Sequence, residues 1–215
     1  MDAIIENLPI FLGGFWTTLR LLLISGIGAL VVGTIVAALR ISPVAALRGF
    51  ATVYTEIFRN IPLTLVLFGC AFVLPYLDVQ FDYFTFAVIG LTAYTSPFIA
   101  EAIRSGINGV ALGQAEAARA IGLTFSQTLR LIILPQGIRM VIPPLLNVLI
   151  ALTKNTSVAG AFFVVELIAT SRQVINVRGD ATIAILLAVA VFYLIITVPL
   201  GQVAARLERK VAVFR

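Results

Sequence analysis

Long apolar runs, separated by short charged segments, are the feature that most constrains how this chain can fold. A membrane-spanning helix needs about 20 consecutive apolar residues, because each residue advances the helix by about 1.5 Å and the hydrocarbon core is about 30 Å thick. Hydrophobic residues make up 60% of the 215 residues and charged residues only 12%. Since an ordinary soluble domain has about a quarter of its residues charged, the sequence predicts an all-α, polytopic membrane protein.

The apolar runs predict five membrane crossings. They cover residues 21–39, 60–77 and 83–100, then an irregular run that begins at residue 140, and finally residues 181–205. The irregular run is apolar from Met140 to Thr153, after which the polar residues Lys154-Asn155-Thr156-Ser157 interrupt it before apolar residues resume. No low-complexity linker divides the chain, so residues 1–215 are expected to form a single integral membrane domain.

Positive charge gathers on one side of the predicted spans. The basic residues that share this side are Arg40, Arg48, Arg104, Arg119, Arg130, Arg139, Arg206, Arg209, Lys210 and Arg215. The opposite side holds the acidic residues Asp2, Glu6, Asp78, Asp82 and Asp180, with Arg172 and Arg178 as exceptions. Because cytoplasmic loops carry an excess of Lys and Arg, we expect the N-terminus outside the cell and the C-terminus in the cytoplasm.

Several function classes are disfavoured by composition. The net charge of +5 comes from basic residues beside apolar spans rather than from a soluble basic face, so no nucleic-acid partner is expected. With no histidine and one cysteine, Cys70, the chain offers no catalytic residues, metal site or cofactor site that we recognise. Both lysines, Lys154 and Lys210, lack the preceding glycine of a P-loop, so the chain is not expected to be an enzyme that hydrolyses ATP.

A polar segment between the third and fourth spans contains QAEAARAIG, residues 114–122. Its alanines and charged residues favour a short cytoplasmic helix, in which Glu116 and Arg119 are spaced as an i,i+3 ion pair. Gly122 suits the left-handed position that follows a helix. Thr124 and Gln127 then form a capping-box pattern for a second helix.

The spacing of this segment resembles a known family motif. The motif consists of Glu116-Ala117-Ala118, three intervening residues, Gly122, nine intervening residues, and Ile132-Ile133-Leu134-Pro135. It is similar to the EAA loop of permease subunits in ATP-binding-cassette importers. Two further stretches resemble the polar amino-acid uptake branch of that family, in particular its glutamate and glutamine permeases. They are residues 54–63, YTEIFRNIPL, and Lys154-Asn155-Thr156-Ser157, although the branch commonly has aspartate where this chain has Asn155.

The resemblance implies a type I importer permease fold, with five transmembrane helices and a cytoplasmic coupling helix in a segment of about residues 108–135. It implies a multi-pass protein of the bacterial plasma (inner) membrane that provides the translocation pathway for an amino acid. The implied partners are two ATPase subunits, which bind ATP and Mg²⁺, a second permease subunit, identical or related, and an external amino-acid-binding protein. The ATPase-coupling residues implied by the motif are Glu116, Ala117, Ala118 and Gly122.

The polar interruption in the fourth span predicts a substrate pathway. Lys154 follows about 14 apolar residues, roughly two thirds of the hydrocarbon core, and cannot easily reach either interface. A cation, a carboxamide and two hydroxyls, from Lys154, Asn155, Thr156 and Ser157, would suit an amino-acid carboxylate. A structural bond from Lys154 to a neighbouring helix is the alternative.

Two questions stay open at this point. A secondary transporter or channel subunit driven by an ion gradient would explain the apolar spans equally well, and a glutamate or glutamine cargo rests on the resemblance. The other ionisable residues also need partners. We expect Arg59 and Arg104 to extend to the cytoplasmic interface and Glu101 to pair with Arg104, whereas the role of Glu166 is undecided.

Overall fold

The computed structural model describes residues 2–212, and every regular element within that range is a helix. The α-helices are α1 (Asp2–Glu6), α2 (Leu8–Arg40), α3 (Ala45–Asn60), α4 (Leu63–Phe68), α5 (Leu74–Tyr76), α6 (Tyr83–Asn108), α7 (Leu112–Ala120), α8 (Phe125–Gln127), α9 (Leu134–Asn155), α10 (Leu167–Val177) and α11 (Thr182–Ala212). Turns of π-helix, Gly69–Val73 and Thr128–Ile133, join α4 to α5 and α8 to α9. Turns of 3₁₀-helix, Thr156–Ala161 and Gly179–Ala181, follow α9 and precede α11.

The number of spans agrees with the sequence prediction. Four stretches are long and apolar enough to cross a membrane, namely Leu8–Arg40, Tyr83–Asn108, Phe125–Ala161 and Gly179–Lys210. The bent pair Ala45–Asn60 and Leu63–Tyr76 supplies a fifth if it counts as one span. The all-α, five-span architecture is therefore confirmed.

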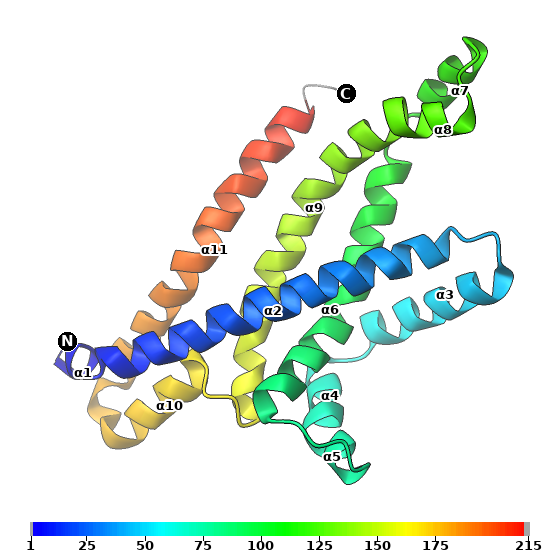
Figure 1. Ribbon diagram of the computed structural model, residues 1–215. Helices are drawn as coiled ribbons and strands as arrows, with labels where there is room; N and C mark the ends of the chain where they lie inside the picture. The colour runs from blue at the N-terminus through cyan, green and yellow to red at the C-terminus, as the bar shows by residue number, and fades with distance from the viewer. Residues whose placement is uncertain (1, 213–215) are drawn as a thin grey trace.

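The first span is longer than predicted. It was expected to begin at residue 21, but α2 begins at Leu8 and has 33 residues, about 50 Å at about 1.5 Å per residue. Arg20 therefore lies inside the helix, and its guanidinium covers the ring of Phe84, 4.8 Å from the centroid. A helix longer than the hydrocarbon core must tilt, and Figure 1 shows α2 lying obliquely across α6 and α9.

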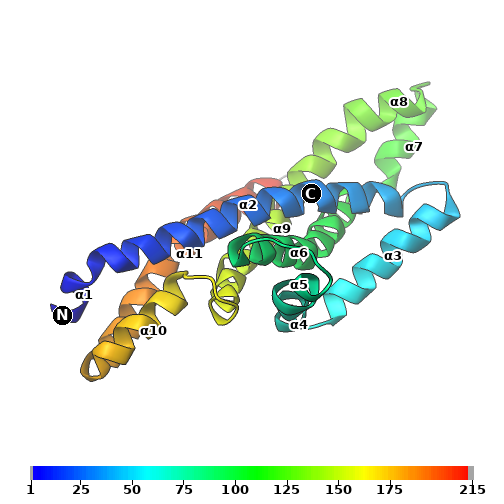
Figure 2. The ribbon, with the colours of Figure 1, turned by 60° about the horizontal axis from the view of Figure 1, so that its bottom comes forward.

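The second span was predicted over residues 60–77, which corresponds to the helical stretch Leu63–Tyr76. The helix before it, Ala45–Asn60, was not predicted, and it meets this stretch at an angle of 105°. The cause is Pro62, which has no N–H to donate and disfavours helical backbone at the residue before it; Ile61 is accordingly extended, with φ −97° and ψ 149°. Figure 2 shows α3 folding back alongside α2 before the chain turns into α4.

The core forms where α6 meets its neighbours. One buried cluster joins α2, α4, α6 and the end of α9, and includes Leu21, Leu67, Leu91 and Leu152. Glycine lets α2 approach closely, since a Cβ at Gly33 would lie within 2.8 Å of atoms of α6. Small residues matter here because lipid provides no hydrophobic drive for helices to associate, so close van der Waals contact must hold them together.

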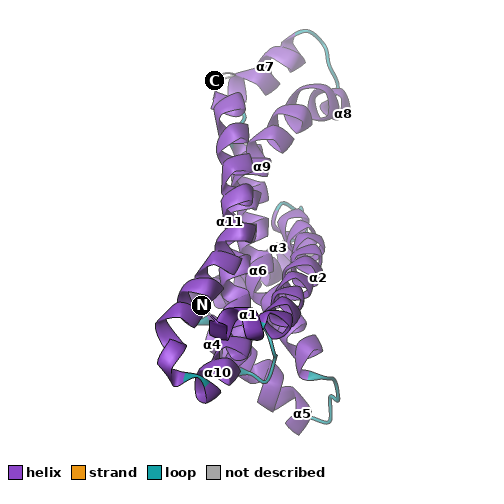
Figure 3. Cartoon of the chain, turned by 90° about the vertical axis from the view of Figure 1, so that its left-hand side faces the viewer, coloured by secondary structure: helices purple, strands orange, loops and turns teal. Residues whose placement is uncertain are grey.

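The two ends of the molecule differ. Figures 1 and 3 place the N-terminus, α5 and α10 at one end, and α7, α8 and the end of α11 at the other. The predicted coupling segment is therefore remote from the N-terminus, as five crossings require. Helix α6 leads into this segment and helix α9 follows it.

Replacing Gly33 by alanine tests the contact between α2 and α6. The added Cβ would meet the Ser96 carbonyl oxygen at 2.6 Å and Ile99 at 2.8 Å, and such overpacking costs about 1–3 kcal/mol of unfolding free energy. Gly13→Ala is the matched control, because it lies on the same helix with nothing within 4 Å of the added atom. Thermal unfolding in detergent should show a lower midpoint for Gly33→Ala than for Gly13→Ala; equal midpoints would contradict the assigned packing.

Candidate functional site

The helix predicted within QAEAARAIG is α7, which spans Leu112–Ala120. It ends in a Schellman motif, in which the Leu123 amide donates to the Ala118 carbonyl (3.1 Å) and the Gly122 amide donates to the Arg119 carbonyl (3.0 Å). Gly122 has φ +87°, a left-handed conformation that side chains with a Cβ adopt only at a cost. The predicted terminating position of Gly122 is confirmed.

The next helix begins as predicted. The Gln127 amide donates to the Thr124 hydroxyl (3.3 Å), and the Thr124 amide donates to the Gln127 side-chain oxygen (2.9 Å), which completes the capping box. Helices α7 and α8 with the turn between them thus form a hairpin whose geometry is set locally. We call residues 112–127 the coupling hairpin.

The side chains of the coupling hairpin are distributed unevenly. Arg119 donates to the Ala115 carbonyl (3.2 Å), and within residues 2–212 no ion pair joins it to Glu116, so the predicted pair is wrong. Glu116 and Ala117 are exposed, whereas Ala118 is buried. Large apolar side chains are also exposed on the hairpin, namely Leu112 (82%), Ile121 (78%) and Phe125 (80%). Exposed apolar residues grouped in this way are typical of a protein-interaction surface.

The two helices that carry the hairpin cross at close range. A Cβ at Gly106 of α6 would overlap the side chain of Val141 on α9 and lie 2.9 Å from its backbone nitrogen. A Cβ at Gly109 would lie 3.1 Å from the sulfur of Met140. Helices α6 and α9 are therefore closely packed where they lead into and out of the hairpin.

The predicted pathway residues lie where α9 ends and a 3₁₀ turn begins. Lys154 is exposed and Asn155 is partly buried. Thr156 is fully buried and donates to the Thr153 carbonyl (2.7 Å), while Ser157 donates to the Lys154 carbonyl (2.6 Å). Both hydroxyls thus bond to backbone, and the structure does not bring all four side chains to one point.

A cleft of about 440 Å³ opens between α6 and α9, within the range of about 300–1,000 Å³ that is usual for small-molecule sites. It is lined by Tyr94, Thr95, Phe98, Asn147, Val148, Ala151, Leu152 and Asn155. The Thr95 hydroxyl is buried without a hydrogen-bond partner among the described residues. Of this lining only Asn155 was predicted. Asn147 could have been found from its position eight residues before Asn155, on the same helical face, but nothing in the sequence indicated Tyr94 and Thr95.

Glu166 occupies a buried position that the sequence left undecided. It is 0% exposed and caps α10, accepting hydrogen bonds from the amides of Ile168 (2.9 Å) and Ala169 (2.8 Å) and from the Tyr193 hydroxyl (3.0 Å). Burial raises the pKa of the Glu166 carboxyl, and these hydrogen bonds oppose the rise. Its bonds satisfy a helix terminus and join α10 to α11, and it lies outside the lining of the cleft.

Comparison with known proteins identifies the family. The profile described as "Binding-protein-dependent transport system inner membrane component" matches residues 8–213. The chain belongs to this family. The permease is thus a multi-pass membrane protein and a transport subunit of an ATP-driven importer, in which separate subunits hydrolyse ATP. Such importers generally combine permease and ATPase subunits with a binding protein. The alternative of an ion-gradient-driven transporter or channel is set aside.

Relatives and solved structures agree with this assignment. The permease is 42% identical to the glutamate transport system permease protein GluC of Corynebacterium efficiens, over 95% of each chain. It is 39% identical to a probable glutamine ABC transporter permease protein, GlnM, of Bacillus subtilis, over 98% of this chain and 97% of the relative. The crystal structure of an amino acid ABC transporter with histidines matches with a TM-score of 0.90 at 26% identity, covering 96% of both chains. The predicted importer permease fold is therefore confirmed.

No metal-binding group emerges from the part of the chain that the structure describes. Within residues 2–212 no cluster of three or more His, Cys, Asp or Glu side chains could hold a metal ion.

Substitution of Glu166 tests its capping role. Glu166→Ala would leave two amides and the Tyr193 hydroxyl without their acceptor, at about 1–3 kcal/mol for each buried group that stays unsatisfied. Glu166→Gln keeps one acceptor oxygen and nearly the same shape, and is the matched control. We expect thermal unfolding in detergent to rank Glu166→Ala well below Glu166→Gln and wild type. An alanine variant as stable as the glutamine variant would rule out the capping role.

Proposed function

We propose that this permease carries glutamate or glutamine into the cytoplasm. The observation that carries the proposal is the chemistry of the cleft between α6 and α9, whose lining contains no acidic side chain. A carboxylate or carboxamide would find the side-chain amide of Asn155 and the unpaired Thr95 hydroxyl there, whereas the amide of Asn147 donates to Glu208 of α11 at 3.5 Å. The names of the two relatives, a glutamate and a probable glutamine permease, support the same cargo class.

Lys154 supplies the positive charge that an amino-acid carboxylate needs. Asn147, Ala151 and Lys154 are spaced i, i+4, i+7 and so share one side of α9. Asn147 and Ala151 line the cleft. Lys154 does not line it, but its position on the same side of α9 supports assigning it to the pathway. Its side chain is exposed, and no acidic side chain within residues 2–212 forms an ion pair with it. We assign Lys154 and Asn155 to the substrate pathway, while Thr156 and Ser157 shape the backbone beside it.

The coupling hairpin is the part that we propose the ATPase subunits grip. Its exposed apolar residues and the unpaired carboxylate of Glu116 suit a partner groove with a basic group. Ala117 lies on the exposed side and permits close seating, whereas the buried Ala118 lets α7 lie against Thr128–Ile133. Gly122 fixes the angle at which the chain leaves α7. ATP and Mg²⁺ then bind to two partner ATPase subunits rather than to this chain.

The orientation in the membrane follows from charge. We propose that the N-terminus is outside and the C-terminus cytoplasmic, with the coupling hairpin on the cytoplasmic side. The hairpin and the end of α11 lie at the same end of the molecule (Figure 1), and these segments carry the basic residues Arg119, Arg206, Arg209 and Lys210. The opposite end would receive the amino acid from the external binding protein, and a second permease, identical or related, would complete the pathway.

Gly122→Ala tests the coupling assignment. Gly49 and Gly122 both have open space around an added Cβ, but Gly49 lies on α3 outside the hairpin and only Gly122 of the two has a positive φ. Alanine at Gly122 should cost about 1–2 kcal/mol and reorient the end of α7, so substrate-stimulated ATP hydrolysis by the reconstituted importer should fall severalfold. Gly49→Ala should retain wild-type hydrolysis. Equal hydrolysis by the two variants would contradict the role of Gly122.

Lys154→Met tests the pathway assignment. Loss of a charge-assisted contact worth about 1.5 kcal/mol or more should lower the rate of glutamate uptake into proteoliposomes about tenfold, with assembly of the complex unchanged. Lys210→Met, which alters the other lysine of the chain, should transport normally. Unchanged uptake by Lys154→Met would return Lys154 to a structural role, and uptake of arginine at the glutamate rate by wild type would contradict the proposed cargo.

A further inference from the structure

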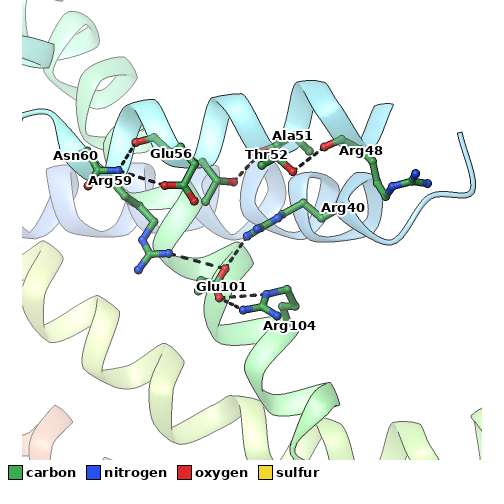
Figure 4. A network of polar contacts seen from close by, with 10 residues as sticks. Arg40, Arg48, Ala51, Thr52, Glu56, Arg59, Asn60, Glu101 and Arg104 are labelled. Carbon is green, nitrogen blue, oxygen red and sulfur yellow. Dashed lines mark hydrogen bonds and ion pairs between the residues drawn. The ribbon is translucent and has the colours of Figure 1, made fainter. Parts of the chain in front are cut away.

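Glu101 of α6 lies at the centre of three arginines, which Figure 4 shows converging on its carboxylate. Arg40 donates to Oε2 at 2.6 Å, and Arg104 donates to Oε1 through Nε at 3.0 Å and through a second nitrogen. Arg59 approaches Oε2 to 3.9 Å, an ion pair without a hydrogen bond. The Glu101–Arg104 pair was predicted from the i,i+3 spacing. The convergence of Arg40 and Arg59 was not, because both are distant from Glu101 in the sequence.

The three arginines come from three helices. Arg40 is the last residue of α2, Arg59 lies in the last turn of α3, and Arg104 is on α6 itself. The side chains of Arg40 and Glu101 are only 17% and 23% exposed, so water screens this pair less than an exposed one. Within residues 2–212 no other acidic side chain pairs with Arg40 or Arg59. A single carboxylate therefore compensates three cations at this junction.

Helix α6 carries the proposed functional parts in order along its length. Tyr94, Thr95 and Phe98 line the cleft, Glu101 follows one turn later, and Gly106 contacts α9 before the chain enters the coupling hairpin at Leu112. Arg59 also lies over the ring of Phe98, 5.8 Å from its centroid. The Glu101 junction is thus placed between the cleft and the hairpin.

Helices α2 and α3 reach the coupling hairpin through α6, on which both pack. Apolar contacts hold them together along part of their length, through a cluster of Val36, Ala37, Ala51 and Ala100. The Tyr54 hydroxyl adds hydrogen-bond contacts with the Ala93 carbonyl (3.1 Å) and the Ser96 hydroxyl (2.7 Å). Ion pairs act over longer distances than these apolar contacts and hydrogen bonds. The ion pairs of Glu101 join the last turns of α2 and α3 to α6.

We propose that Glu101 is a positioning residue that makes α2 and α3 move with α6 when the ATPase subunits displace the coupling hairpin. The inference rests on the proposed function, since it needs the hairpin to be where the displacement enters. A helix transmits a rigid-body movement to neighbours only if contacts fix their relative positions. With Glu101 in place, movement of α6 shifts the walls of the cleft together with α2 and α3. Without it, three guanidiniums repel one another and the junction opens.

The test compares Glu101→Gln with wild type in the complete importer, reconstituted with its ATPase subunits, partner permease and binding protein. The measured quantity is the number of amino-acid molecules transported per ATP hydrolysed. We expect this ratio to fall at least threefold while ATP hydrolysis continues, because the hairpin still engages the ATPase. A merely structural role would lower the yield of assembled importer and leave the ratio per assembled complex unchanged.

Glu56→Gln is the matched control. Glu56 is an exposed carboxylate on α3 whose side chain accepts one contact, from Asn60 at 3.3 Å. It should transport with the wild-type ratio. If Glu101→Gln does not assemble, Glu101→Asp decides, since it keeps the charge but retracts the carboxylate from Arg40 by one methylene.

The outcomes separate the two proposals. A lowered ratio in whichever Glu101 variant assembles, with a normal ratio in Glu56→Gln, supports the inference. A wild-type ratio in that variant overturns it and leaves the proposed function standing. Failure of the wild-type importer to move glutamate or glutamine under ATP hydrolysis would contradict the proposed function itself.

Discussion

The close packing of α6 against its neighbours is the constraint on which the rest of this permease depends. Lipid tails are as apolar as leucine side chains, so burial from water does not hold these helices together within the membrane. Glycines at the crossing points, Gly33 on α2 and Gly106 on α6, allow backbones to approach closely enough for van der Waals contact to do so. Because α6 also continues toward the coupling hairpin, the same contacts that stabilise the fold connect its two ends.

Some polar groups inside this apolar protein have hydrogen-bond or ion-pair partners, whereas others have none among the described residues. Glu101 accepts hydrogen bonds from two arginines and forms an ion pair with a third, and Glu166 accepts from two amides and a tyrosine. The Thr95 hydroxyl and Lys154 have no such partners among the described residues. An unpaired polar group withdrawn from water is costly, and under the proposed function a passing substrate would supply the partner that the buried Thr95 hydroxyl lacks.

Local chemistry was readable from the sequence because it depends on residues a few positions apart. The end of α7 at Gly122, the capping box of Thr124 and Gln127 and the Glu101–Arg104 pair all followed from spacings of three or four residues, and each is present. The spans themselves followed from apolar length alone. The Glu116–Arg119 pair was predicted from the same kind of local spacing but is absent, because Arg119 donates instead to a backbone carbonyl one turn away.

The sequence by itself thus determined that the chain is a five-span membrane protein whose third and fourth spans are separated by a segment with the importer permease motif, since hydropathy and motif spacing depend only on the order of residues. Only the tertiary structure decided which side chains line the cleft between α6 and α9, and that Arg40 meets Glu101 across 61 residues. Those features depend on how helices cross. Crossing geometry is set by which small residues on different helices come into contact, and no single segment of sequence contains that information.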